Sequence, residues 1–219
     1  MLPTSPQNNQ RSAPKQVTYI AVAGNIGCGK STLVDFICRT YGLQPFFEPN
    51  QNNPYLVDFY ADMRTWAIHS QLYFLTHKFR IHRELEHQRL SQTVVQDRTI
   101  YEDAEVFATY LHRRRFINQR DWGLYQDLYT TIAQVLRPPD LMIYLKASVR
   151  TIRQRIKLRG RAEEQKIPVA YLRSLNGLYE EWLASYKRSP CVVLETDKLD
   201  YLTDLVDRLD LRKAIEQHL

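Results

Sequence analysis

The chain has 219 residues, of which 44% are hydrophobic and 25% charged, values typical of a globular protein. The length fits one domain or at most two small ones, and it is enough to bury a core without disulfides or metals. No run of eighteen apolar residues occurs, which excludes a membrane-spanning helix, and the N-terminus lacks an apolar signal core. Three cysteines without a C-x-x-C pair suit a reducing compartment, so we expect a cytoplasmic protein without a membrane partner.

The net charge of +6 favours anionic partners such as nucleotides and also permits nucleic acid. The basic residues are spread along the chain, apart from residues 113–115 and an arginine-rich region at 153–161. We therefore expect small anions and no nucleic-acid partner. The six histidines show no H-x-x-x-H pattern in a suitable setting, so no zinc or iron site is predicted.

Residues 1–15 are polar and contain prolines, which predicts a disordered N-terminal tail. No repeat, low-complexity tract or linker follows, so residues 16–219 are predicted to form a single domain.

Short apolar runs separated by helical patterns predict five buried strands. They are Thr18–Ala23, Pro45–Glu48, Thr93–Asp97, Leu141–Leu145 and Cys191–Glu195. Continuous apolar runs are typical of a parallel sheet covered on both faces, so we predict a three-layer α/β/α fold with a five-stranded parallel sheet. Ligands bind beyond the carboxyl ends of such strands, and the first three runs end at Gly24, Glu48 and Asp97.

Helices are predicted between these strands from apolar periodicity, with prolines marking some of their ends. One follows the first strand, with Leu33, Phe36 and Ile37 on one face. The others are Met63 to about Leu90, Ile100–Arg115, Trp122–Leu136, Val149–Leu158, Pro168–Lys187 and Asp200–His218.

A glycine-rich loop joins the first strand to its helix and matches the G-x-x-x-x-G-K-[ST] phosphate-binding pattern. Its residues are Gly24, Asn25, Ile26, Gly27, Cys28, Gly29, Lys30, Ser31 and Thr32. Glycines let the backbone N–H groups approach phosphate oxygens closely, and the helix N-terminus adds partial positive charge. Lys30 is expected to reach the β- and γ-phosphates and the Ser31 hydroxyl to hold Mg²⁺. We therefore predict a user of nucleoside triphosphates, and the alternative is a chance glycine turn.

Two carboxylates follow neighbouring strands. Glu48 can act as a general base toward a substrate hydroxyl, or be a surface acid before a turn proline. Asp97 can bind Mg²⁺ and Arg98 a phosphate, or the two can belong to a buried ion pair. The strand-end positions favour the functional interpretation.

Two further groups are less specific. Arg155, Arg159 and Arg161 near Gly160 suit a mobile lid that stabilises a transferring phosphoryl group, or a solvated helix end. Tyr60, Trp66 and Gln71 lie in an aromatic-rich helical region that could bind a base or simply pack in the core.

Taken together, these motifs closely resemble the deoxyribonucleoside kinase family from about Tyr19 to Tyr201. The resemblance is carried by the glycine-rich loop, by Glu48-Pro49, by the stretch DRTIYED at 97–103, and by LRGRAEEQKIP at 158–168, which is similar to the family's arginine lid. It implies a P-loop kinase fold and ATP-dependent phosphorylation of the 5′-hydroxyl of a deoxynucleoside in nucleotide salvage, with Mg²⁺. It also implies a homodimer formed through helices near the middle of the chain.

The resemblance assigns roles to individual residues. Glu48 would take the proton from the 5′-hydroxyl, with Arg98 beside it, and Ser31 and Asp97 would hold Mg²⁺. The remaining roles are as follows: Tyr60 and Glu164 at the 3′-hydroxyl, Gln71, Asp103 and Phe107 at the base, Arg155, Arg159 and Arg161 at the triphosphate, and Asp200 and Tyr201 near the adenine of ATP.

The sequence departs from the family pattern at two positions. Lys78 stands where the family often has an arginine facing the base, so the compact ammonium charge of lysine replaces a planar guanidinium group. Asp97 stands where many members have a glutamate. Gln71 and Asp103 suit a base with an exocyclic amine, so we predict deoxyadenosine or deoxyguanosine as best substrate, deoxycytidine as a further candidate and thymidine as poor.

Two other functions compete with this one. A nucleoside monophosphate kinase of thymidylate type would need basic residues near the Glu48 loop, but the segment 49–54 has none. An ATP-binding regulatory or nucleic-acid-binding protein would need a basic face and a second module, and the sequence indicates neither.

Overall fold

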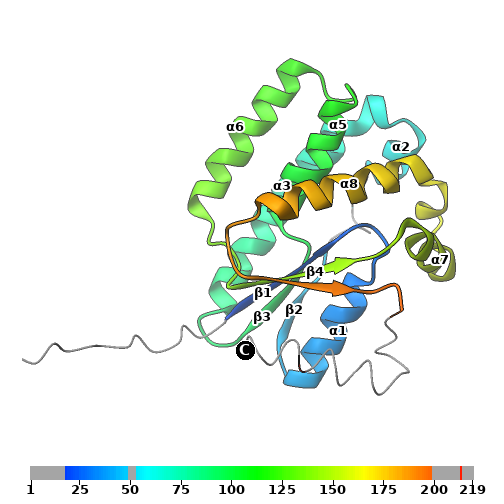
Figure 1. The fold of residues 1–219 in the computed structure, drawn as a ribbon. Helices are drawn as coiled ribbons and strands as arrows, with labels where there is room; N and C mark the ends of the chain where they lie inside the picture. The colour runs from blue at the N-terminus through cyan, green and yellow to red at the C-terminus, as the bar shows by residue number, and fades with distance from the viewer. Residues whose placement is uncertain (1–17, 49–52, 199–212, 214–219) are drawn as a thin grey trace, which may run out of the picture.

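The computed structural model describes residues 18–48, 53–198 and 213. Five parallel strands form one sheet in the order β2-β3-β1-β4-β5, as Figure 1 shows. Their bounds are β1 Tyr19–Gly24, β2 Gln44–Phe46, β3 Val94–Asp97, β4 Leu141–Lys146 and β5 Cys191–Glu195. The predicted five-stranded parallel sheet is confirmed, and its central strand β1 is fully buried because layers cover both faces.

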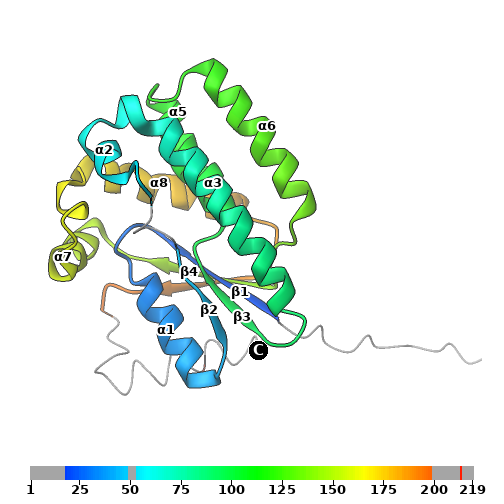
Figure 2. The ribbon, with the colours of Figure 1, turned by 180° about the vertical axis from the view of Figure 1, so that it is seen from behind.

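The helices form the outer layers. α1 (Lys30–Tyr41) lies on one face, and α3 (Met63–Gln88) and α8 (Val169–Ser185) lie on the other, as both views show (Figures 1 and 2). α6 (Gln119–Val135) packs on α3 at the outside, and α7 (Val149–Arg159) lies beyond the carboxyl end of β4. Within the part of the chain that the structure describes, no helix is long and apolar enough to cross a membrane.

Strand β2 differs from its prediction. It covers Gln44–Phe46 rather than Pro45–Glu48, since its pairing with β3 ends at Phe46, whose side chain is buried whereas that of Phe47 is 46% exposed. β2 is an edge strand. Pro45 has no N–H group to donate and is tolerated there, because one side of an edge strand has no neighbouring strand to bond. Glu48 therefore lies two residues beyond the strand, in the segment that faces the site.

The predicted helix starting at Met63 is preceded by a separate short helix, α2 (Leu56–Ala61). Asp62 divides the two: its backbone is non-helical, and its side chain accepts hydrogen bonds from the N–H groups of Arg64 and Thr65. This N-cap starts α3 at Met63.

The predicted helix 100–115 is continuous, but its central segment is π-helical. It consists of α4 (Ile100–Glu102), a π-helical segment η2 (Asp103–Ala108) and α5 (Thr109–Arg113). The other predicted helices are present with shifted ends. Asn118 caps α6, which starts at Gln119, three residues before the predicted start at Trp122, and Gly160, with a φ of 71°, ends α7. The predicted tail 1–15 and the last helix, except Lys213, lie outside the described residues.

Candidate active site

The glycine-rich loop has a backbone that only glycine accommodates at three positions. Gly24, Gly27 and Gly29 have φ angles of 142°, 76° and 109°, in the region that side chains strongly disfavour. A Cβ atom at Gly24 would lie 2.7 Å from the carbonyl oxygen of Leu145, and one at Gly27 would lie 2.8 Å from Ile156. The loop is therefore wrapped tightly over β4 and α7.

Side chains fix this loop from inside. Asn25 donates to the carbonyl of Leu172 at 2.9 Å and to Asn176 at 2.6 Å, which ties the loop to α8. Lys30 Nζ donates to the carbonyl of Asn25 at 3.0 Å, so the ammonium lies over the loop. Cys28 is buried, and burial raises the pKa of its thiol. The thiol is therefore a packing group here.

Ser31, at the start of α1, and Asp97, at the end of β3, bring two oxygen atoms together. Ser31 Oγ donates to Asp97 Oδ2 at 2.5 Å, although the two residues lie on different elements. Asp97 Oδ1 is buried and has no hydrogen-bond partner among the described residues. A hydroxyl and a carboxylate are ligands that suit Mg²⁺, which takes most of its other ligands from water and substrate phosphates. No group of three or more His, Cys, Asp or Glu side chains gathers as a metal site within the same residues.

Glu48 and Arg98 form a buried ion pair. One guanidinium nitrogen of Arg98 lies 2.9 and 2.7 Å from the two carboxylate oxygens of Glu48, and the other donates to the carbonyl of Gly24 at 3.2 Å. Burial opposes the positive charge of Arg98, but Glu48 and other acids outweigh burial and raise the pKa of Arg98. The arginine therefore stays cationic beside the carboxylate and the glycine-rich loop.

Arg98 also has a left-handed backbone, with a φ of 59°. Such a conformation is strained for a non-glycine residue and persists only when its surroundings hold it. Here the N–H group of Arg98 donates to Val22 of β1 at 3.0 Å, and Lys78 Nζ donates to its carbonyl at 2.6 Å. Strain of this kind is common at functional sites.

An aromatic cleft of about 650 Å³, open mouth included, adjoins Lys30 and Ser31. Leu56, Phe59, Tyr60, Phe74, Phe107 and Tyr171 supply most of its apolar wall. Two polar atoms in it, Gln71 Oε1 and Asp103 Oδ2, are buried without a hydrogen-bond partner among the described residues. Buried polar groups are normally paired, so these atoms indicate a polar ligand.

The π-helical segment η2 supplies two residues of this cleft. Asp103 and Phe107 both line it, and the guanidinium of Arg98 lies 4.6 Å from the Phe107 ring. Burial raises the pKa of Asp103 to about 7, with Lys78 opposing this shift and Glu48 adding to it. Single π-helical turns are rare and often mark functional sites. The apolar periodicity of the sequence did not predict this π-helical segment.

The arginine-rich segment divides into two parts. Arg159 lies on the cleft wall and binds Glu164 at 2.9 and 2.5 Å, while Arg161 lies 3.3 Å from the same carboxylate. Glu164 is buried beside the cleft. Burial, with Glu164 as the next cause, raises the pKa of Tyr60, so the tyrosine is a neutral hydroxyl.

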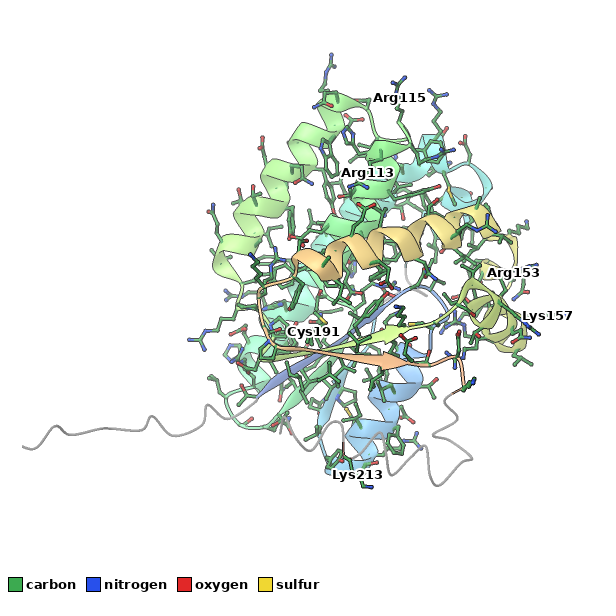
Figure 3. All side chains as sticks on the ribbon, viewed as in Figure 1. Arg113, Arg115, Arg153, Lys157, Cys191 and Lys213 are labelled. Atoms are coloured by element: carbon green, nitrogen blue, oxygen red, sulfur yellow. The ribbon has the colours of Figure 1, made fainter. Side chains whose placement is uncertain are left out.

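Arg155 lies in a different setting from the other two arginines. It donates to the carbonyls of Cys28 and Thr196, each at 2.6 Å, and to Thr196 Oγ1 at 3.0 Å. The structure thus brings Arg155 beneath the glycine-rich loop and does not bring it into the cleft. Arg153 and Lys157 of the same helix point outward into solvent, far from the basic run at Arg113 and Arg115 (Figure 3).

Glu102 is a site residue that the sequence interpretation missed. It is fully buried and accepts hydrogen bonds from the N–H groups of Gly24 (3.1 Å) and Thr99 (3.0 Å) and from the hydroxyl of Tyr179 (2.9 Å). It joins the glycine-rich loop to the N-terminus of α4. The signal that could have found it is the capping pattern Thr99-x-x-Glu102.

The structure brings most of the other predicted residues together at one cleft and at the loop beside it; the exceptions are Arg155, which lies beneath that loop, and three more residues. Lys78 is fully buried behind the wall, and Asp200 and Tyr201 lie outside the described residues. The fold and the cleft together define a phosphotransferase of the P-loop class with a pocket for a small acceptor.

Comparisons with known proteins narrow this class. Residues 20–219 match the family described as "Deoxynucleoside kinase". The chain is 35% identical to the deoxyadenosine kinase of Dictyostelium discoideum over 86% of this chain and 76% of that protein. It is 33% identical to the deoxyadenosine/deoxycytidine kinase of Bacillus subtilis (strain 168), over 85% and 86% respectively. A structure of deoxyadenosine kinase from M. mycoides with bound dATP superposes with a TM-score of 0.77 at 30% identity, covering 91% of this chain and 99% of that one.

The chain therefore belongs to the deoxynucleoside kinase family, as its motifs predicted. It is a phosphotransferase with the P-loop kinase fold, and its reaction is nucleoside phosphorylation. The two competing functions, a monophosphate kinase of thymidylate type and a regulatory or nucleic-acid-binding protein, are not favoured.

Proposed function

We propose that this protein transfers the γ-phosphoryl group of ATP to the 5′-hydroxyl of a purine deoxyribonucleoside. The observation that carries the proposal is the position of Glu48. Its carboxylate is held by Arg98 in the same cleft as Lys30 of the glycine-rich loop and as the oxygens of Gln71 and Asp103 that lack a hydrogen-bond partner among the described residues. A base, a phosphate clamp and a polar ligand pocket are the parts that phosphoryl transfer to a small alcohol needs.

In the proposed reaction Glu48 accepts the proton of the 5′-hydroxyl, and Arg98 neutralises the charge that develops next to it. Lys30 clamps the transferring phosphate, and Arg159 and Arg161 close on the triphosphate from the lid. Ser31 and Asp97 would hold Mg²⁺, which neutralises phosphate charge in this class of reaction. The unpaired Asp97 Oδ1 supports that assignment.

Tyr60 and Glu164 are proposed to bind the 3′-hydroxyl of the sugar. Both line the cleft, Glu164 as an acceptor and Tyr60 as a neutral hydroxyl. Glu164 also binds Arg159, so occupation of the sugar site and closure of the lid share one carboxylate. Tyr60 is expected to crowd the 2′ position, which disfavours ribonucleosides.

Gln71, Asp103 and Phe107 are proposed to bind the base. Gln71 Oε1 and Asp103 Oδ2, which lack a hydrogen-bond partner among the described residues, are acceptors that an exocyclic amine or ring N–H satisfies, and Phe107 offers a ring surface to the base. Deoxyadenosine and deoxyguanosine fit this pattern best, and deoxycytidine presents a similar amine. Two relatives named as deoxyadenosine kinases support the purine preference.

The test is ATP consumption by the purified protein with each of the four deoxynucleosides, with a deoxynucleoside monophosphate, or with DNA. The proposal predicts turnover with purine deoxynucleosides, weak turnover with thymidine, and none with the other two acceptors. Asp103→Ala should reduce kcat/KM for deoxyadenosine by about 5- to 150-fold, because one buried hydrogen bond is lost. A preference for thymidine or for the monophosphate would refute the proposal.

We also propose a homodimer and a cytoplasmic location. Leu124, Leu128 and Val135 expose large apolar surfaces on α6, and their spacing puts them on one face of that helix. The three cysteines are free thiols, which supports a reducing compartment. Sedimentation of the wild type and of Leu124→Glu would test the dimer. Asp200 and Tyr201 remain predicted contacts of the ATP adenine.

A further inference from the structure

Lys78 lies on α3 with a side chain that solvent does not reach. Its ammonium group donates to the carbonyl of Arg98 at 2.6 Å and contacts the carbonyl of Asp97 at 3.4 Å. It also lies 3.3 Å from Glu48 Oε1, whereas Asp103 Oδ2 is 3.9 Å away, beyond hydrogen-bond distance. The three N–H groups of the ammonium therefore match two carbonyls and the carboxylate of Glu48.

The position of Lys78 does not fit contact with a base. Gln71 of the same helix lines the cleft, but Lys78 is absent from its wall. Seven residues separate the two, which is about 10 Å along a helix. The residue that could read a base from this helix is thus Gln71, and the Lys78 ammonium lies behind Glu48 and the turn at 97–98.

The turn that Lys78 contacts is the strained one. The left-handed φ of Arg98 turns the chain sharply between β3 and α4, and the carbonyls of Asp97 and Arg98 both point toward the ammonium. Without a cation, two buried carbonyl oxygens and a carboxylate would face one another without a donor, which costs free energy. The same cation thus holds both Glu48 and the backbone that carries Arg98.

We propose that Lys78 is a positioning residue that holds Glu48, the proposed general base, and the Asp97–Arg98 turn in their reactive arrangement. This inference rests on the proposed function. A positioning residue lowers kcat for every deoxynucleoside, whereas a residue that only reads the nucleobase changes the ranking of the substrates.

The experiment compares wild type with Lys78→Met, which keeps a long side chain and removes the charge. Because misplacement of a reacting group by about 1 Å costs about 100-fold, we expect kcat to fall by about 10- to 100-fold. The fall should be the same within about threefold for all four deoxynucleosides, with KM for each changed less than threefold.

A double-variant cycle separates positioning from a general structural role. In the Glu48→Gln background the base is already lost, so Lys78→Met should cost less than it does in the wild type. Leu85→Val is the matched control, since Leu85 is a buried residue of the same helix outside the cleft. It should lower the melting temperature and leave kcat and the ranking of the deoxynucleosides unchanged. If Lys78→Met does not fold, the same criteria apply to Lys78→Gln, which keeps a donor for the carbonyl of Arg98.

Three results would overturn the inference. They are a ranking of deoxynucleosides altered by tenfold or more, an unchanged kcat, and single effects that multiply independently in the double variant. A wild type that phosphorylates no deoxynucleoside would instead refute the proposed function, and the inference would fall with it. An active wild type together with an altered ranking in Lys78→Met would refute the inference alone.

Discussion

The buried carboxyl group of Asp103 should make the protein less stable as the pH rises through the acidic range. Burial raises its pKa from 3.8 to about 7, with the Lys78 charge opposing that shift. Between these two values the native state binds more protons at Asp103 than the unfolded state does. Under proton linkage, this residue's contribution to the free energy of unfolding therefore falls as the pH rises from about 4 to about 7, and it is constant outside that window.

The magnitude follows from the size of the shift. The difference between 3.8 and about 7 is about three pKa units, and each unit corresponds to about 1.4 kcal/mol. Ionisation of Asp103 in the folded state thus costs about 4 kcal/mol, which is a large part of the usual stability of a domain. Asp103→Asn removes the ionisation and keeps the size of the side chain. Relative to wild type, the variant should gain about 4 kcal/mol between pH 4 and pH 8.

Urea unfolding of wild type and Asp103→Asn at several pH values between 4 and 8 measures this difference directly. Asp62→Asn is the control, because hydrogen bonds from Thr65 and Arg64 lower the pKa of Asp62 below its ordinary value of 3.8, so that its titration lies below pH 4. It should show no gain in stability with rising pH. A difference between wild type and Asp103→Asn that stays flat across this range would mean that Asp103 is ionised in the folded protein at pH 5, and the linkage argument would be wrong.

Three further predictions concern activity. Lys30→Ala should nearly abolish turnover while the protein stays folded by circular dichroism, and normal turnover would exclude the phosphate clamp. Glu48→Gln should lower kcat by about 10²- to 10⁴-fold while calorimetry still detects deoxynucleoside binding; an unchanged kcat would mean that another group takes the proton. A 3′-deoxy substrate should lose about 1–3 kcal/mol, or about 5- to 150-fold in kcat/KM, because Tyr60 and Glu164 lose their partner. Equal rates for the analogue and its parent would remove these two residues from the sugar site.

Most of the sheet could be predicted because buried parallel strands are continuous apolar runs. The runs that became β1, β3, β4 and β5 were placed within one residue at each end. The edge strand β2 was the exception, since it starts one residue and ends two residues before its predicted bounds, where its pairing with β3 stops. The π-helical segment was not predictable from local patterns, because its apolar residues also satisfy an α-helical period.

Site residues could be found where a local motif carries the chemistry. The glycine-rich loop, Glu48 and the Asp97-Arg98 pair all belong to short patterns at strand ends. Contacts between distant parts of the chain could not be found in this way. Glu102 binds Gly24 across 78 positions and Arg155 reaches Thr196 across 41, and neither pair has a sequence signal of its own.

The stretch 97–103 links the two halves of the cleft because of one backbone angle. Asp97 contacts Ser31 beside the glycine-rich loop, whereas Asp103 lies at the proposed base pocket, and the left-handed turn at Arg98 lets one short segment serve both. Any shift of that turn would move the proposed metal ligand and the acid–base pair together. We therefore expect that removing the cations and donors that hold this turn lowers kcat. This explains why Lys78, far from the surface, is placed among carbonyls where a neutral side chain would leave them unpaired.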